Sequence, residues 1–358
     1  MKPPKVDLDL GMLTYLTEGP SLKGRLREKP SDFVVDEVLK GLRASISLRE
    51  GFGSSHGKYV LLVGARIGKD TLTVASLISK HYKDVRYSGL KDKRSVAFQY
   101  FTARGAEKEI KGRGFLVKPV GKRELPLRRG ENEGNWFYIR VRGVSELNLP
   151  SRFPNFFSYQ RFGVKRPYNH EIGRALVRRE FREAIDMIKQ QGHLSEANPN
   201  IQSIVSAIGK GLARLYVHSY QSYLFNILLS KRLEEGLALR EGDYVLKDGW
   251  ILTHPEDGDL LLPVPGGFTK TLGGWLEDTL NSLLREEGVK LRDFLFKEVP
   301  DVSGFGDFRK ALESPKDLKI FKVESGFILS FFLSSGVYAT SLLREVLKPR
   351  DPLAQGFL

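Results

Sequence analysis

The sequence predicts an α+β protein in which a sheet is interrupted by a mostly helical insertion. The first 150 residues contain runs of β-branched and aromatic residues bounded by Gly, Pro and Asp, a pattern that is typical of strands. After Pro150, apolar residues recur at helical spacing instead. Strand patterning returns after Phe321. We therefore expect the two strand-rich ends of the chain to belong to one sheet domain.

Strands are predicted wherever the β-branched and aromatic runs occur, which is at residues 33–38, 58–63, 96–101, 136–142 and 328–333. Between the second and third runs, the pattern predicts one helix over 71–82. Asp70 or Thr71 is its expected N-cap, because either side chain can accept a hydrogen bond from the first turn.

The middle of the chain is predicted to be helical at 181–188 and 216–233. Three arginines spaced four apart would lie on one helical face: Arg174, Arg178 and Arg182. Gly and Pro are dense at 248–273, which predicts loops there.

The longest uncharged stretch, residues 325–343, is long enough to raise the question of a membrane span. It is rich in serine, and Ser334, Ser335 and Gly336 are typical of a turn in its middle. Strand, turn and helix is therefore the better interpretation. The first residues lack the apolar core of a signal peptide, so we expect a cytoplasmic protein that does not enter a membrane.

The amino-acid composition excludes several classes of protein and favours one kind of partner. The chain has no cysteine, which excludes a disulfide scaffold, a zinc ribbon, an iron–sulfur protein and a cysteine nucleophile. Its six histidines show no i, i+4 pair, so a helical zinc site is unsupported. The net charge of +14 favours a polyanion as partner, because Lys and Arg that neutralise phosphates release counterions.

Two segments resemble nucleotide-binding loops but lack required glycines. Residues 51–57 have one residue too many for a dinucleotide fingerprint. Residues 66–71 lack the early glycine of a Walker A loop, and Asp70 would point a carboxylate at the phosphates. We interpret both as ordinary turns.

The segment that carries chemistry is residues 87–99. Here Asp92 stands among Lys91, Lys93 and Arg94, directly after a glycine-containing turn. Nearby cations hold a carboxylate ionised even when it is partly buried. An ionised carboxylate can act as a nucleophile or as a general base. The alternative is a solvated, charged turn.

The chain resembles the TruD family of tRNA pseudouridine synthases over almost its whole length. The resemblance rests on segments in the same order as in the family, at 24–35, 89–99, 134–137, 154–163, 220–226 and 336–345. It implies an enzyme that detaches a uracil from its ribose, rotates it and rejoins it through C5, without cofactor or metal. The implied substrate is tRNA, at uridine 13, and other uridines stay open.

The resemblance also assigns roles. Asp92 matches the essential aspartate, the proposed nucleophile, whose attack on sugar or base stays open. Arg27 matches the basic residue that pairs with this carboxylate. Phe137 matches the aromatic residue that stacks on the flipped target base, and Asn135 lies beside it on the approach to the site.

Some of these residues have a second interpretation. Phe137 shares a strand face with Ile139 and Val141, so it could be a core residue. Gln99 and Lys91 complete the expected substrate-binding set, although Gln99 is more simply a support of the loop through hydrogen bonds.

The resemblance implies a mixed, largely antiparallel sheet in a catalytic domain formed by residues 1–152 and 313–358. Residues 153–312 would form a mostly helical insertion, the TRUD domain, and the cleft between the two would hold the RNA. We expect a monomer. The alternative function is a non-catalytic, basic RNA-binding protein of the same fold.

Overall fold

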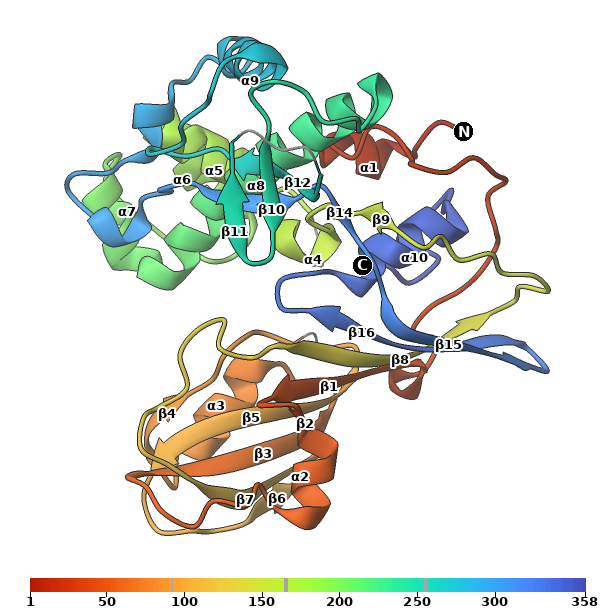
Figure 1. Cartoon of the computed structure of the whole chain (residues 1–358). Coiled ribbons are helices and arrows are strands. Elements are labelled where there is room, and N and C mark those ends of the chain that lie inside the picture. Colours follow the sequence, from red (N-terminus) through yellow and green to blue (C-terminus); the bar gives the residue numbers. More distant parts are fainter. Residues whose placement is uncertain (92, 164–166, 254–256) are drawn as a thin grey trace.

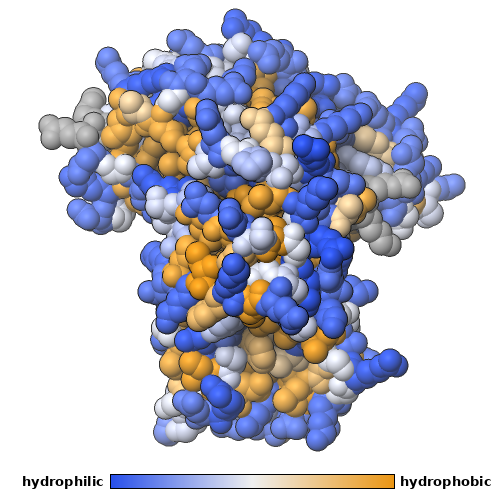
Figure 2. All heavy atoms as spheres, turned by 90° about the vertical axis from the view of Figure 1, so that its right-hand side faces the viewer, coloured by the Kyte–Doolittle hydropathy of each residue, from blue (hydrophilic) through white to orange (hydrophobic). Residues whose placement is uncertain are grey.

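The protein is described by a computed structural model, which covers residues 1–91, 93–163, 167–253 and 257–358. Figure 1 shows a sheet body below and a body rich in helices above, which meet along strands near the centre of the picture. Seen from the side, most of the surface is hydrophilic, and the upper body is broader than the lower one (Figure 2). The predicted α+β class is confirmed.

The sheet body is built on one ten-stranded sheet with the order β15-β16-β8-β1-β5-β3-β7-β6, to which β2 and β4 add at β1 and β5. β1 and β5 run parallel, and the other recorded pairs are antiparallel, as expected for a mixed, largely antiparallel sheet. The strands are β1 Phe33–Leu39, β2 Leu42–Arg43, β3 Tyr59–Ile67, β4 Lys83–Arg86, β5 Val96–Arg104, β6 Ile110–Gly112, β7 Phe115–Arg123, β8 Gly134–Arg142, β15 Lys316–Val323 and β16 Gly326–Ser334.

Two helices cover opposite faces of this sheet. Helix α3 (Thr71–Ser79) packs on a core that includes Leu62 of β3. Helix α2 (Ala44–Glu50) packs on a second core that includes Leu61 and Val63, the neighbours of Leu62 in the same strand. Because successive side chains of a strand point to opposite faces, this alternation places the two helices on the two sides of the sheet.

The middle region, which we define as residues 153–312, is mostly helical. Its longest helix is α8 (Lys210–Glu235), whose side chains enter both large hydrophobic cores of the molecule. The other elements are α4 Tyr159–Phe162, α5 Asn169–Val177, α6 Phe181–Gln190, α7 Ile201–Ile208, α9 Gly274–Glu286, the 3₁₀ helices η2 Leu291–Phe294 and η3 Pro300–Val302, and the strands β9 Phe153–Pro154, β10 Tyr244–Lys247, β11 Trp250–Leu252, β12 Asp259–Val264, β13 Asp307–Lys310 and β14 Leu312–Glu313.

Both ends of the chain pack beside the middle region. Helix α1 (Lys5–Asp9) lies next to the helical body, and helix α10 (Ala339–Leu347) lies below it (Figure 1). A buried ion pair joins them, with Arg344 Nε 2.6 Å from Asp7 Oδ2. The short helix η1 (Pro30–Asp32) leads into β1. The expected strand, turn and helix at 325–343 are confirmed as β16, the turn at Gly336 and α10.

Two sequence predictions were wrong. The loops expected at 248–273 include β11 and β12, because the glycines and prolines there separate strands that pair with β10 and β13. The three arginines do not share one helix, because α5 ends at Val177 and α6 begins at Phe181. Between them, Arg179 has a left-handed φ of 64°, which interrupts the helical path. In the described part of the chain, no helix is long and apolar enough to cross a membrane.

Candidate active site

A buried polar network fixes the backbone just before Asp92. Gln99, fully buried on β5, donates from Nε2 to the carbonyl oxygen of Gly89 over 2.6 Å. Its Oε1 accepts from Thr71 Oγ1 at 2.9 Å and from Arg66 NH1 at 3.3 Å. Thr71 Oγ1 accepts from the Lys91 amide at 2.8 Å, and Arg66 NH2 donates to the Lys91 carbonyl at 3.2 Å. These hydrogen bonds therefore fix the backbone conformation of residues 89–91.

A buried ion pair lies beneath the same loop. Lys91 Nζ is 2.6 Å from Oε1 of Glu37, which is fully buried on β1. The same oxygen accepts from Ser88 Oγ at 3.0 Å, and Oε2 accepts from the Tyr100 amide at 2.9 Å. A buried charge is tolerated only when it is paired and hydrogen-bonded, and here the carboxylate has partners on both oxygens. The Lys91 side chain thus points into the sheet body.

Sequence reasoning missed three members of this network: Glu37, Arg66 and Thr71. A signal existed for the two charged residues, because each interrupts a strand that is otherwise mainly apolar and buried. Charged side chains in such strands need partners, since an unpaired buried charge is costly. The segment 66–71, interpreted as an ordinary turn, also starts α3 and contributes directly to the loop.

Arg27 binds the backbone of residues 356–357. It is 6% exposed and has a left-handed φ of 54°. Its NH1 donates to the carbonyl oxygens of Gly356 at 2.8 Å and Phe357 at 3.1 Å. Arg94, two residues after Asp92, donates to the carbonyl of Leu358 in the same segment. Arg27 and Arg94 therefore both bind the segment 356–358.

The segment 355–358 is held by close contact with the backbone of Leu26. The Leu26 amide donates to the Gln355 carbonyl at 2.9 Å. A β-carbon on Gly356 would come within 2.1 Å of the Leu26 carbonyl oxygen, and the φ of Gly356 is +82°. Only glycine fits both conditions at this position. The segment 355–358 is thereby held against the backbone that carries Arg27.

Phe137 and Asn135 lie on β8, next to β1. The Phe137 ring is edge-on to Phe33 at 6.1 Å and stacked on Phe331 at 5.6 Å between centroids. The Arg27 guanidinium lies 4.1 Å over the Phe33 ring, so Arg27 and Phe137 both contact this one aromatic residue. Phe137 is only 6% exposed. The Phe137 ring is therefore largely covered, with Phe33 and Phe331 among its neighbours.

Asn135 stands opposite Glu37 in the register of β8 and β1. Its Oδ1 is buried and has no hydrogen-bond partner among the described residues. A buried acceptor without a partner is costly, and in a native structure it calls for an explanation such as a ligand or water. Asp92 itself, the predicted nucleophile, lies outside the described residues.

A cavity of about 520 Å³ lies where the middle region meets the turn after β16. Ser335 and Gly336 line it from the sheet side, and Arg161, His218 and Arg309 line it from the other. Ser335 Oγ donates to Asn132 Oδ1 at 3.2 Å, and that oxygen is 4.0 Å from where a β-carbon on Gly89 would be. The cavity thus adjoins the loop of the candidate active site.

Two basic side chains that line this cavity, Arg309 and His218, are largely removed from water. Burial lowers the pKa of Arg309 to about 10 and, together with the charges of Arg161, Arg214 and Arg129, lowers the pKa of His218 to about 4. The Arg309 guanidinium lies 4.3 Å over the Phe157 ring and donates to the carbonyl oxygen of Asn155 at 2.8 Å and of Gly336 at 2.9 Å. It thereby joins the two halves of the cavity wall.

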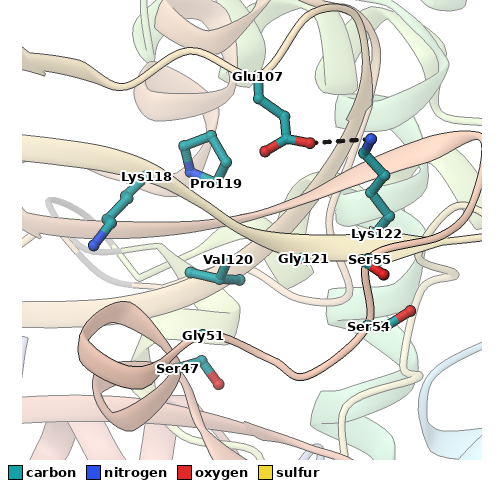
Figure 3. Close-up of a pocket in the computed structure, with 10 residues that line it drawn as sticks. All are labelled: Ser47, Gly51, Ser54, Ser55, Glu107, Lys118, Pro119, Val120, Gly121 and Lys122. Carbon is teal, nitrogen blue, oxygen red and sulfur yellow. Dashed lines mark ion pairs between the residues drawn. The ribbon is translucent and has the colours of Figure 1, made fainter.

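A second cavity, of about 310 Å³, lies against β7, away from these residues. Figure 3 shows Lys122 paired with Glu107 at 3.1 Å on one side, with Ser54 and Ser55 below. It contains none of the predicted site residues. Among the described residues, no group of three or more His, Asp and Glu is placed to hold a metal ion.

The comparisons with known proteins agree with this architecture. The family model for tRNA pseudouridine synthase D (TruD) matches residues 9–198 and 189–346. The chain is therefore a member of a pseudouridine synthase family, and that family is TruD.

Relatives that carry the name tRNA pseudouridine synthase D match over nearly their whole length. The protein of Pyrobaculum islandicum is 29% identical over 99% of this chain and 99% of its own. That of Pyrococcus furiosus is 30% identical over 95% and 99%. A solved structure from Methanosarcina mazei with the same name has a TM-score of 0.68 at 24% identity, over 97% and 99% of the two chains, and shows the shared fold.

Proposed function

We propose that this protein is a tRNA pseudouridine synthase that converts uridine 13 of tRNA to pseudouridine, with Asp92 as the nucleophile. The N1–C1′ bond breaks, a C5–C1′ bond forms, and the proton on C5 is replaced by one on N1. The reaction is an isomerisation, so it requires no oxidant, reductant or group donor. The family, the net charge of +14 and the cavity beside the loop support this proposal.

One observation carries the proposal. Gln99, Thr71 and Arg66 clamp the backbone of residues 89–91, which directly precede Asp92 in the chain, and Arg27 and Arg94 both donate to oxygens of the segment 356–358. A catalytic carboxylate needs such preorganisation, since small misplacements cost large factors in rate. A solvated turn, the alternative interpretation, needs no buried network.

The remaining residues follow from their contacts. Arg27 favours the ionised form of the Asp92 carboxylate by its charge. Phe137 turns toward the flipped uracil and stacks on it. The Oδ1 of Asn135 accepts a hydrogen bond from an N–H group of the base. Lys91 and Gln99 position the loop rather than contact the base.

We further propose a division of labour along the chain. Residues 1–152 and 313–358 carry the chemistry, because every residue to which we give a role in the reaction belongs to these two segments. Residues 153–312 capture the tRNA from the other side of the cavity, where Arg161 and Arg309 lie.

The test is Asp92→Asn, which keeps shape but removes the charge. Tritium release from unmodified tRNA carrying 5-tritiated uridine should be undetectable, while tRNA affinity stays within a few-fold of wild type. Asp186→Asn, at an exposed position on α6, is the matched control and should be fully active. Substantial turnover by the Asp92 variant would remove this residue from the nucleophile's role.

The target position and the alternative function need a second measurement. A transcript with cytidine at position 13 should release no tritium if uridine 13 is the target. Release from that transcript would assign another uridine. Tight tRNA binding by the wild type without release from any unmodified tRNA would favour the non-catalytic RNA-binding alternative.

A further inference from the structure

Two phenylalanine rings lie exposed and parallel on the middle region. Phe268 is 66% exposed and Phe305 is 48% exposed. Their centroids are 5.5 Å apart, and the angle between the ring planes is 6°. An apolar pair this exposed contributes little to a core and is typical of a contact surface.

The loops that carry the two rings are tied to each other. The Phe268 amide donates to the Phe305 carbonyl at 2.8 Å, and the Gly267 amide donates to the Gly304 carbonyl at 2.8 Å. Gln221 of α8 lies beneath and donates from Nε2 to the Pro265 carbonyl at 2.7 Å. The parallel rings are therefore presented on a fixed backbone.

Close packing beneath the rings explains the glycines of these loops. A β-carbon on Gly304 would come within 2.7 Å of the Gln221 side chain, and one on Gly266 would come within 2.3 Å of the Gly306 amide nitrogen. The left-handed φ of +98° at Gly306 turns the chain directly after Phe305. The absence of side chains at these glycines lets the two rings lie side by side.

Phe305 also lines the 520 Å³ cavity next to the candidate active site. Arg161 lines the same cavity, with its Nε held by Ser222 Oγ at 3.0 Å. Two carboxylates, Asp307 and Glu313, lie on the wall as well, so the cavity is not uniformly positive. An exposed aromatic face beside a fixed guanidinium suits a nucleotide, which has a flat base and one phosphate.

We propose that Phe305, backed by Phe268, stacks on an unpaired base of the tRNA that neighbours the target uridine, with the adjoining phosphate near Arg161. This inference rests on the proposed function. Flipping one nucleotide leaves its neighbours without a stacking partner, and an aromatic ring replaces that partner. Single-stranded RNA is bound by such rings together with cationic side chains. The cavity adjoins the Asp92 loop through Ser335 and Asn132, as a neighbouring nucleotide requires.

The first experiment measures the affinity for unmodified tRNA. Stacking on one base contributes about 1–3 kcal/mol, so Phe305→Ala should raise Kd about 5- to 150-fold. Phe305→Trp should keep the affinity, whereas Phe305→Leu, which is apolar but has no aromatic face, should lose most of it. Phe268→Ala should have a smaller effect. Phe321→Ala, at a position on β15 with a similar exposed fraction of 52%, is the control and should bind like wild type.

The second experiment detects the stack directly. The tryptophan introduced by Phe305→Trp should lose fluorescence when unmodified tRNA binds, after subtraction of the signal from the native tryptophans. The tryptophan introduced by Phe321→Trp should not respond. Thermal unfolding checks that each variant is folded. Because Phe305 and Phe321 are both exposed, the variants should melt close to the wild-type temperature.

The outcomes separate this inference from the proposed function. Wild-type affinity of Phe305→Ala together with unquenched fluorescence in Phe305→Trp would overturn the stacking role, even if the enzyme makes pseudouridine. Conversely, weakened binding and quenching in a protein that forms no pseudouridine would support the subsite and overturn the proposed reaction.

Discussion

The ammonium of Lys91 lies 2.6 Å from Glu37 Oε1, and both side chains are buried beneath the loop that leads to Asp92. This pair ties the loop to β1, the strand that joins β5 to β8 at the centre of the sheet. The residue that precedes the proposed nucleophile Asp92 thus directs its charge into the protein interior.

Glu37→Gln should destabilise the protein by about 3–5 kcal/mol, because it leaves the Lys91 charge buried without its partner. The double variant Glu37→Gln, Lys91→Met should recover much of this loss, since both charges are then gone. Denaturant unfolding measures both. If Lys91→Met raises KM and leaves kcat and stability unchanged, Lys91 contacts the substrate after all and the positioning role fails.

Arg27→Lys should retain much of the turnover, because it keeps the positive charge that we propose favours the ionised form of the Asp92 carboxylate. Arg27→Met should lose turnover by about 3–5 kcal/mol, the range for breaking a buried pair. If Arg27 acts as proposed, the acid limb of the pH–turnover profile of Arg27→Met should also move to higher pH, because the carboxylate then loses a charge that favours its ionisation. A variant Arg27→Met with wild-type turnover and an unmoved acid limb would contradict the pairing.

Phe137→Leu separates stacking from core packing. Leucine refills most of the space between Phe33 and Phe331 but cannot stack, so stability should change little while turnover falls by about 1–3 kcal/mol. Phe137→Ala should lose both, with a cavity cost of about 3–5 kcal/mol. Phe137→Tyr should be mild. Normal turnover per folded molecule in Phe137→Leu would leave only the core role.

His218 should make stability depend on pH. Its pKa is about 4 in the folded protein and about 6.5 when unfolded, mainly because of burial. Between these values the unfolded chain binds a proton that the folded protein does not, so stability falls as pH falls through this window. The full loss is about 3 kcal/mol below pH 4 and is absent above pH 6.5. Comparing wild type with His218→Gln cancels the shared titration of other groups.

The melting temperature of wild type should therefore fall more steeply than that of His218→Gln between about pH 6.5 and pH 4, the range that lies between the two pKa values. Parallel curves for the two proteins would show that His218 titrates alike in the folded and unfolded states. The positive charges of Arg161, Arg214 and Arg129 act in the same direction as burial, so added salt should reduce the difference between the curves.

Local patterning located the strands of the sheet well, since β1, β5, β8 and β16 each contain the predicted run. It failed where pairing with a distant segment decides whether a segment forms a strand. This is the case at β11 and β12, which are strands because they pair with β10 and β13. The site shows the same division. Glu37, Arg66 and Gln99 come from three strands, and they meet only because β1 and β3 both flank β5. No local pattern encodes that meeting.

The position of β8 has a consequence for synthesis of the chain. Its partner on one side, β16, is made only after residues 143–325 have left the ribosome. Until then β8 exposes unpaired backbone groups, and open strand edges attract other chains. Meanwhile the core of the middle region can close, because its members all lie between residues 172 and 302. The newly made protein therefore passes through a period with one closed helical core and an unfinished sheet, when aggregation is its main hazard.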